Sequence, residues 1–171
     1  MTDSASDAGP MTIRRATLAD LDAIVSLVPR LVAFGPPPWR DPEAMRATDQ
    51  KVIRAALESR SEDPIVLVAL LNGENVAGLI HLHSETDYYT ESKHGHVADL
   101  VVAGPYEGRG IGRRLLAHAE EWARARGYEW LTISVFRENA RALRTYERAG
   151  FKEDRVRLLK TLNPEAPGPR R

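Results

Sequence analysis

The apolar and polar positions in the first half of the chain predict two helices and then a buried strand. A short strand is predicted at 12–15. Apolar residues at helical spacing then follow Thr17, a candidate helix N-cap, and continue to the three prolines at 36–38. A second helix is predicted from 41 to about 60. The run IVLVALL at Ile65–Leu71 has the length and composition of a strand buried on both faces.

The second half alternates between strands and helices. Asn72-Gly73 predicts a hairpin turn into a strand at 76–83, and an exposed polar loop is expected at 84–93. Because the early strands are joined by a hairpin and the later ones by a helix, we expect one α/β domain with a mixed sheet. It spans 11–162, between disordered tails at 1–10 and 163–171. Its remaining elements are a strand at 96–103, a helix from 111 to Gly127, a strand at 130–135, a helix at 139–149, and one strand or a tight hairpin at 151–162.

One stretch, GPYEGRGIGRRLLAHAEEWARARG at 104–127, has the features of a phosphate-binding site. An amphipathic helix begins within it, and a helix N-terminus carries about half a positive charge. Arginines there are unfavourable unless an anion lies among them, and glycines expose the backbone N–H groups that bind phosphate. The spacing fits neither a P-loop, which requires Lys and Ser/Thr after its glycines, nor a dinucleotide fingerprint. The residues concerned are Gly108, Arg109, Gly110, Gly112, Arg113 and Arg114.

Composition narrows the function classes that remain. Of the 171 residues, 24 are Lys or Arg and 24 are Asp or Glu, so no overall charge favours nucleic acid or an anionic membrane. The chain has no cysteine, which excludes disulfides, thiolate metal sites and a cysteine nucleophile. No apolar run has membrane-spanning length, and residues 1–10 lack the basic and apolar parts of a signal peptide. We therefore expect a cytoplasmic protein with neither nucleic-acid nor membrane partners.

Two motifs together resemble those of the GCN5-related N-acetyltransferase (GNAT) superfamily. The pyrophosphate-binding signature of that family is Arg/Gln-x-x-Gly-x-Gly/Ala after a strand. EGRGIG at 107–112 matches it at both glycines and departs from it at Glu107. The resemblance implies a mixed, mostly antiparallel sheet flanked by helices and splayed between its fourth and fifth strands, here 96–103 and 130–135. The second motif, which closes the family's domain, is matched at every named position by Val135-x-x-x-Asn139-x-x-Ala142-x-x-x-Tyr146-x-x-x-Gly150-Phe151.

The resemblance implies acetyl-CoA as the cofactor and an amine as the acceptor. Acetyl-CoA would lie in the splay, with its pyrophosphate on the glycine-rich loop and its pantetheine arm paired with strand 96–103. No metal is expected. The family also allows a homodimer, and no residue of this chain decides whether one forms. The positions that the resemblance assigns to acetyl-CoA are Leu100, Val101, Val102, Gly108, Arg109, Gly110, Ile111, Gly112, Arg113, Asn139 and Tyr146.

Two residues are candidates for catalysis. Tyr146, whose hydroxyl has an ordinary pKa of about 10, can donate a proton to the departing thiolate. Asp99 is an acid within an apolar strand, so it is either the base that takes the amine proton, directly or through water, or part of a structural salt bridge. Glu107 pairs with Arg109 or Arg113, or it simply favours the helix N-terminus before the cofactor binds.

Four histidines lie on the two strands that flank the polar loop. If His83 faces His94, then His81 faces His96, and all four share one face of the sheet. They could then hold a metal or place a histidine near the amine, although four half-exposed residues with no common task are the simpler interpretation. Strand alternation puts Asp99 on the face opposite His96 unless a bulge intervenes.

Two functions remain open on the sequence alone. The first is an enzyme that transfers an acetyl group from acetyl-CoA to a primary amine of a small molecule or a protein, directly and within a ternary complex. The second is a non-catalytic acyl-CoA-binding or regulatory module, supported only by Glu107 and by the unassigned base. The acceptor is not specified, because the segments that bind it in the family, here 34–50, 84–95 and 155–160, contain no recognisable signature.

Overall fold

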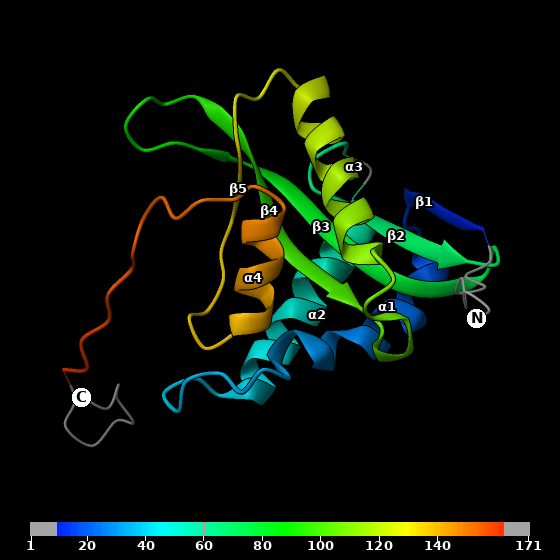
Figure 1. Ribbon diagram of the computed structural model, residues 1–171, viewed down its shortest axis with the longest axis horizontal. Coiled ribbons are helices and arrows are strands. Elements are labelled where there is room, and N and C mark those ends of the chain that lie inside the picture. Colours follow the sequence, from blue (N-terminus) through cyan, green and yellow to red (C-terminus); the bar gives the residue numbers. More distant parts are fainter. Residues whose placement is uncertain (1–9, 60, 163–171) are drawn as a thin grey trace, which may run out of the picture.

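The computed structural model describes residues 10–59 and 61–162, which fold into a five-stranded sheet with helices on both faces (Figure 1). The strands lie in chain order, and all neighbours are antiparallel except β4 and β5, which are parallel. The predicted mixed sheet is confirmed, whereas the predicted tails at 1–10 and 163–171, apart from Pro10, lie outside the described residues. The strands are β1 (Met11–Arg15), β2 (Ile65–Leu71), β3 (Asn75–Thr86), β4 (Lys93–Val102) and β5 (Leu131–Ile133). The helices are α1 (Leu21–Leu27), α2 (Pro42–Glu58), α3 (Ile111–Ala125) and α4 (Ala140–Arg148), with short 3₁₀ helices η1 (Leu18–Asp20), η2 (Val28–Val32) and η3 (Gly104–Tyr106).

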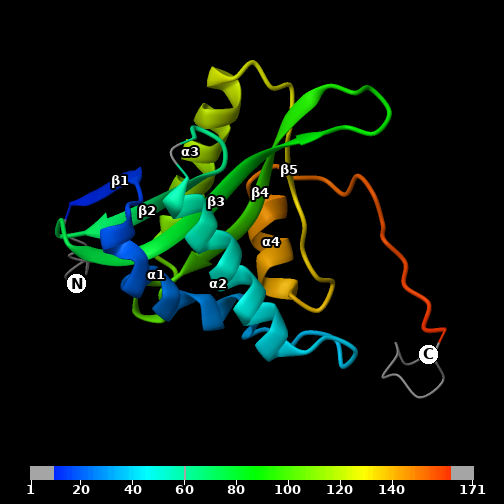
Figure 2. The ribbon, with the colours of Figure 1, turned by 180° about the vertical axis from the view of Figure 1, so that it is seen from behind.

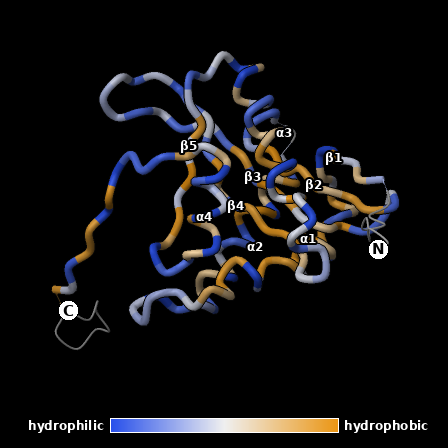
Figure 3. The backbone as a smooth tube through the Cα atoms, viewed as in Figure 1, coloured by the Kyte–Doolittle hydropathy of each residue, from blue (hydrophilic) through white to orange (hydrophobic). Residues whose placement is uncertain are grey.

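The sheet separates two apolar layers. α1 and α2 cover one face and α3 covers the other, as the front and back views show (Figures 1 and 2). Every residue of β2 is buried, which agrees with its continuous apolar sequence, and hydrophobic colours gather along the central strands (Figure 3). In the part of the chain that the structure describes, no helix is long and apolar enough to cross a membrane.

The first predicted helix is interrupted. In place of one continuous helix after Thr17, the chain forms η1, α1 and η2 in succession. Its start follows the prediction, because the Asp20 carboxylate accepts a hydrogen bond from the Thr17 backbone N–H at 2.8 Å. The α-helix ends at Leu27 because Pro29, two residues on, has no N–H to continue the hydrogen-bond ladder.

The polar segment 84–93 is only partly a loop, contrary to the sequence-based prediction. β3 continues to Thr86 and β4 begins at Lys93, and these two residues pair with each other. The loop is therefore confined to 87–92. The ends of the two strands form an antiparallel ribbon that projects beyond the helices (Figure 1), and polar residues suit a ribbon that meets solvent.

The sheet opens between β4 and β5 after a short region of pairing. Gly95, His96 and Val97 of β4 pair with Leu131–Ile133, and the pairing ends there. Among the described residues, no strand pairs with 98–102 on the side of β5, so this edge of β4 forms one wall of an opening. The predicted splay between the fourth and fifth strands is confirmed.

Gly95 fixes where this pairing begins. A Cβ at Gly95 would lie 2.9 Å from the side chain of Leu131 and 2.9 Å from that of Trp122 on α3, so no larger residue fits. The Gly95 N–H also donates to the carbonyl oxygen of Trp130 at 3.2 Å. Close packing on both sides therefore holds β4 in one register against β5 and α3.

Residues 151–162 form neither the strand nor the hairpin that the sequence predicts. The chain leaves the domain after Phe151 and extends away from the sheet (Figures 1 and 2). A strand requires a hydrogen-bonded neighbour, and within the described residues this segment has none. Its exposed apolar side chains are Val156, Leu158, Leu159 and Leu162.

Candidate active site

The glycine-rich loop turns tightly into the N-terminus of α3. Gly108 and Gly110 both have a φ of 76°, in the left-handed region that favours glycine, and Gly110 is the N-cap of the helix. The Arg114 N–H donates to the carbonyl oxygen of Gly110. The N–H groups of 111–113 precede this bond, so they have no acceptor within the helix and point out of its N-terminus.

The three arginines of this region point to different places. Arg109 lies over the ring of Tyr106, with its Cζ 5.6 Å from the ring centroid. Arg114 reaches back to β1 and donates to the carbonyl oxygen of Met11 at 3.2 Å. Arg113 is exposed on the first turn of α3. Arg109 and Arg113 are therefore the cations nearest in sequence to the exposed N–H groups, whereas Arg114 is engaged elsewhere.

Alternate residues of β4 present their backbone groups to the opening. The N–H of Ala103 donates to the carbonyl oxygen of Ala77 at 2.8 Å, at the start of β3. Because backbone groups alternate in direction along an antiparallel strand, those of Val101 also face β3, whereas those of Leu100 and Val102 face the opening. The opening therefore offers peptide groups to a ligand in the position of a missing strand.

α4 lies beside the opening (Figure 1). Asn139 is its N-cap, and the side-chain oxygen accepts a hydrogen bond from the Ala142 N–H at 3.2 Å, which leaves the two amide donors for another partner. The ring of Tyr146 packs edge-on against Phe151 with 6.0 Å between centroids. Burial, and then the charge of Asp99, raises the pKa of Tyr146 to about 12. Its hydroxyl is therefore protonated at neutral pH.

A β-bulge in β4 determines the face on which Asp99 lies. Asp99 pairs with His81, whereas Val97 pairs with the residue that follows His81, so Ala98 is an extra residue in β4. The extra residue brings Asp99 onto the same face as His96. The sequence put these two residues on opposite faces unless a bulge intervened, and the extra residue at Ala98 is that bulge.

Asp99 contacts a buried histidine and acts electrostatically on residues of two helices. Its Oδ2 is 3.0 Å from Nδ1 of His81, a side chain that is 2% exposed. Nε2 of His81 is buried without a hydrogen-bond partner among residues 10–59 and 61–162. Burial, and then the charge of Asp99, raises the pKa of Asp49 on α2 to about 6. Since the charge of Asp99 also acts on Tyr146, one carboxylate influences groups on both α2 and α4.

The histidines share one face of the β3–β4 ribbon, although not in the register expected. His83 pairs with His96, and His94 pairs with Glu85. The Glu85 carboxylate lies 3.3 Å from Nε2 of His83, 3.7 Å from Nε2 of His94 and 3.6 Å from Nδ1 of His96. Burial lowers the pKa of His96, and Glu85 partly offsets this effect. In the described part of the chain, no group of three or more His, Cys, Asp or Glu side chains has the geometry of a metal site.

Glu107 pairs with Arg30 and Arg141 and not with the arginines expected from the sequence. Its Oε1 accepts from Nη2 of Arg30 at 2.5 Å, and its Oε2 accepts from Nη1 of Arg141 at 2.6 Å. These contacts, the bond from Arg141 first, hold the pKa of Glu107 below its ordinary value. The carboxylate is therefore ionised and neutralised by two cations from η2 and α4.

Sequence reasoning missed Asp49 and Arg30. A signal for Asp49 was available, because it falls four residues after Met45 and four before Ile53, on the apolar side of the predicted helix. Arg30 offers no such signal, since its partner Glu107 is 77 residues away in the chain.

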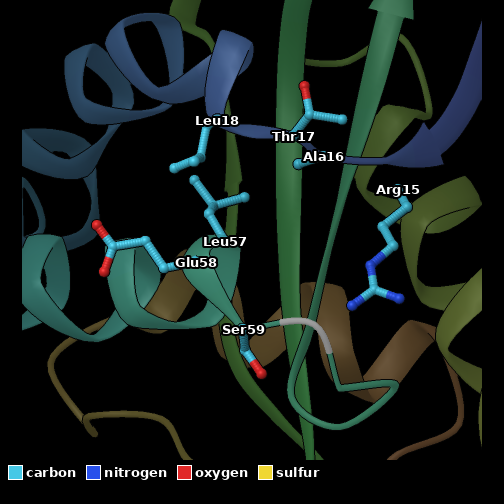
Figure 4. A pocket seen from close by; sticks show the side chains of 7 residues that line it. All are labelled: Arg15, Ala16, Thr17, Leu18, Leu57, Glu58 and Ser59. Atoms are coloured by element: carbon cyan, nitrogen blue, oxygen red, sulfur yellow. The ribbon is translucent and has the colours of Figure 1, made fainter.

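A separate pocket lies at the C-terminal end of α2 (Figure 4). It is lined by residues 15–18, where β1 leads into η1, and by residues 57–59. None of these residues borders the opening between β4 and β5, so the pocket is not part of this site.

Comparison with known proteins gives matches over most of the chain. The family model described as "Acetyltransferase (GNAT) family" matches residues 29–151. The aminoalkylphosphonate N-acetyltransferase of Salmonella typhimurium is 33% identical over 152 residues, which cover 88% of this chain and 90% of that protein. The uncharacterized N-acetyltransferase YhfO of Bacillus subtilis is 30% identical over 146 residues, which cover 84% of this chain and 91% of that protein.

Solved structures share the fold. A putative acetyl transferase from Pyrococcus furiosus superposes with a TM-score of 0.72 at 23% identity, covering 90% of this chain and 100% of that chain. AAC(6')-Iy, in complex with the bisubstrate analogue CoA-S-monomethyl-acetylneamine, superposes with a TM-score of 0.68 at 18% identity, covering 90% and 99%. At these identities the likeness establishes the fold alone.

Proposed function

Because this chain belongs to the acetyltransferase (GNAT) family and is an acetyl-CoA-dependent N-acetyltransferase, we propose that it transfers the acetyl group directly to a primary amine in the opening between β4 and β5. Both substrates are bound together. The amine nitrogen attacks the thioester carbonyl carbon, the C–S bond breaks, and the amine proton passes to a base. One observation supports this placement above all: the N-terminus of α3, the unpaired edge of β4, Asp99 and Tyr146 all belong to the same opening.

The N-terminus of α3 and the edge of β4 bind the cofactor. The backbone N–H groups from Gly108 to Arg113 take the pyrophosphate, and Arg109 and Arg113 offset its charge. The pantetheine amides pair with the peptide groups of Leu100 and with the N–H of Val102, whose carbonyl oxygen already accepts from Arg30. Asn139 contributes its amide donors from the α4 side. A β4 N–H group beside the thioester stabilises the negative charge that develops on its oxygen.

Tyr146 stabilises the leaving group. A thiol, with a pKa of about 8.5, is a stronger acid than a hydroxyl whose pKa is about 12. The hydroxyl therefore donates a hydrogen bond to the departing thiolate, and solvent supplies the proton of the released thiol. This refines the role of proton donor that the sequence suggests.

Asp99 takes the amine proton, directly or through a water molecule. Its carboxylate is oriented by the Nδ1–H of His81, and the charge of Asp49 lies on the opposite, α2 side. Together these two carboxylates favour a cationic ammonium group at the site. Most of the rate enhancement comes from holding the amine against the thioester.

The non-catalytic alternative loses its main support. Glu107 is neutralised by Arg30 and Arg141, so its carboxylate does not stand unpaired beside a pyrophosphate. An enzyme therefore accounts for the motif without a loss of function.

Release of the CoA thiol from acetyl-CoA with a panel of amines tests the proposal. Aminoalkylphosphonates and aminoglycosides come first in the panel, because proteins similar to this chain are named for them. Tyr146→Phe should lower kcat by about 100-fold. Thr145→Val, which removes an exposed hydroxyl from the same helix, is the matched control and should leave kcat unchanged. An undiminished kcat in Tyr146→Phe contradicts its role, and CoA binding without turnover of any amine contradicts the transfer.

We also propose that the chain forms a homodimer through residues 152–162. This segment exposes Val156, Leu158 and Leu162, and β5 has a hydrogen-bonded neighbour on one side only within the described residues. A second copy supplies both an apolar extended segment and an edge strand to receive it. Light scattering of the unmodified protein should give twice the mass of the monomer. The Leu158→Asp variant should give the mass of a single monomer. A monomeric unmodified protein contradicts the proposal.

A further inference from the structure

Glu107 is the residue at which this chain departs from the signature of its family, and its contacts connect three separate parts of the fold. It lies in the loop before α3, Arg30 lies in η2, and Arg141 lies in the first turn of α4. η2 follows α1 on one face of the sheet, whereas α4 belongs to the other side of the opening (Figures 1 and 2). The carboxylate therefore bridges the mouth of the cofactor site.

The two arginines are held in different ways. Arg30 uses its Nε to donate to the carbonyl oxygen of Val102 at 2.9 Å and its Nη2 to donate to Glu107. Gly104 makes room for it, because a Cβ there would lie 3.0 Å from Nη1. Arg30 is thus fixed at the end of β4 by contacts on several sides.

Arg141 keeps most of its donors free for a ligand. Nη1 donates to Glu107, and the side chain is 66% exposed. A guanidinium carries five N–H donors, so the remaining four can bind phosphate oxygens while the contact with Glu107 persists. Since Glu107 precedes Gly108 directly, Arg141 is held one residue from the N–H groups that begin the phosphate site.

The net charge of Glu107, Arg30 and Arg141 together can be compared with the charge of the residue that the family signature has at position 107. Glu107 carries −1 and each arginine carries +1, so the group has a net charge of +1, equal to that of arginine, one of the two residues (Arg or Gln) that the family signature has at this position. We propose that Glu107 is a positioning residue that holds Arg141 as a ligand for the pyrophosphate of acetyl-CoA, with Arg30 as its fixed anchor. The inference rests on the proposed cofactor site at the N-terminus of α3.

The direction in which Glu107→Gln changes the Kd for CoA distinguishes this proposal from a purely repulsive effect of the carboxylate. If Glu107 were only a repulsive carboxylate beside the pyrophosphate, Glu107→Gln would tighten CoA binding. If it positions Arg141, the same change weakens binding, because the neutral amide holds the guanidinium less firmly. We expect a rise of about tenfold in the Kd for CoA, in keeping with one charge-assisted hydrogen bond.

The experiment measures CoA and dephospho-CoA binding by calorimetry, and initial rates with acetyl-CoA and an amine. Arg141→Ala and Glu107→Gln should each raise the Kd by about tenfold. The effect should be the same for CoA and for dephospho-CoA, because each of these ligands contains the pyrophosphate. The KM for acetyl-CoA should rise with it, while the KM for the amine and kcat stay within about twofold. The double variant should be no weaker than Arg141→Ala, because the two residues act through one contact.

Arg144→Ala, which removes an exposed arginine of the same helix, is the control and should leave the Kd unchanged. Tighter or unchanged CoA binding in Glu107→Gln overturns the inference, as does a loss confined to CoA and absent with dephospho-CoA. Failure of the unmodified protein to bind CoA would instead overturn the proposed cofactor site itself. The two failures are therefore distinguishable.

Discussion

The two sides of the opening between β4 and β5 are built from different kinds of group. On the proposed cofactor side, the groups are backbone N–H groups at the start of α3 and peptide groups of Leu100 and Val102. On the proposed acceptor side, they are side chains such as Asp99, His81 and Asp49. Backbone groups bind the invariant part of a substrate whatever the surrounding side chains are, whereas a side-chain surface changes with each substitution. The first side is therefore suited to a shared cofactor and the second to a particular amine.

The largest expected effect is on the acceptor side, in Asp99→Asn. The amide cannot take a proton from the amine, so kcat should fall by about 100-fold. The KM for acetyl-CoA should stay within about twofold, because the cofactor side keeps its backbone groups. Steady-state rates with both substrates varied provide the measurement. Asp22→Asn, at an exposed residue of α1, is the control, and an equal loss in both variants would show that charge in general matters.

A smaller effect is expected on the cofactor side, in Gly110→Ala. The φ of 76° at this N-cap is strained for alanine, so the turn that exposes the N–H groups relaxes and the Kd for CoA should rise by about tenfold. Gly73→Ala introduces the same strain at a φ of 81° in the β2–β3 turn and serves as the control. Calorimetric titration with CoA should separate the two. Equal affinity for CoA in both variants would argue against a pyrophosphate-binding site at the N-terminus of α3.

A third prediction concerns stability on the acceptor side, in Asp49→Asn. The pKa of Asp49 is raised to about 6 in the folded protein, so folding favours its protonated form. The protonated carboxyl therefore contributes to the free energy of unfolding below the pKa of the unfolded chain, about 4. This contribution is lost as the pH rises through about 6.

The neutral amide should therefore stabilise the protein by about 1 kcal/mol at about pH 8, a figure that allows for partial solvent screening. This corresponds to a rise in Tm of about 3 °C. At about pH 4 the Tm of the two proteins should coincide. Thermal unfolding at both pH values provides the measurement, and a gain that persists in acid would contradict the assigned cause.

The smallest effect is expected at the histidine face. Glu85 raises the pKa of His96, whereas burial, the larger cause, lowers it. Glu85→Gln should therefore move the pKa of His96 further down. Titration of the imidazole resonances by NMR would detect the change. An upward shift would mean that the carboxylate does not act on this ring.

The same division explains what the sequence could predict. The glycine-rich loop was recognisable because positive φ, free N–H groups and a helix N-terminus all follow from local sequence. The buried strand Ile65–Leu71 and the helix that follows Asn139 are local in the same sense. The splay itself came from the family resemblance, which the structure confirms.

The acceptor side was harder to predict because it depends on pairing between distant residues. The register of His83 against His96 and the extra residue at Ala98 are decided by how two strands meet, and neither is visible in one strand alone. The partners of Glu107 were wrong for the same reason, since Arg30 and Arg141 come from remote segments. The segment 151–162 was predicted as one strand or a tight hairpin, but either needs a hydrogen-bonded neighbour, and the described residues provide none.

The packing of Gly95 under α3 places a constraint on the length of the chain that is separate from any constraint on its residues. Because Gly95 is fixed between Trp122 and Leu131, the number of residues from it to Asp99 decides which face receives the carboxylate. One insertion or deletion in this interval moves Asp99 to the other face, whereas substitutions of Ala98 leave it in place. In the divergence of this protein, the spacing between Gly95 and Asp99 should therefore change more slowly than the residues that fill it.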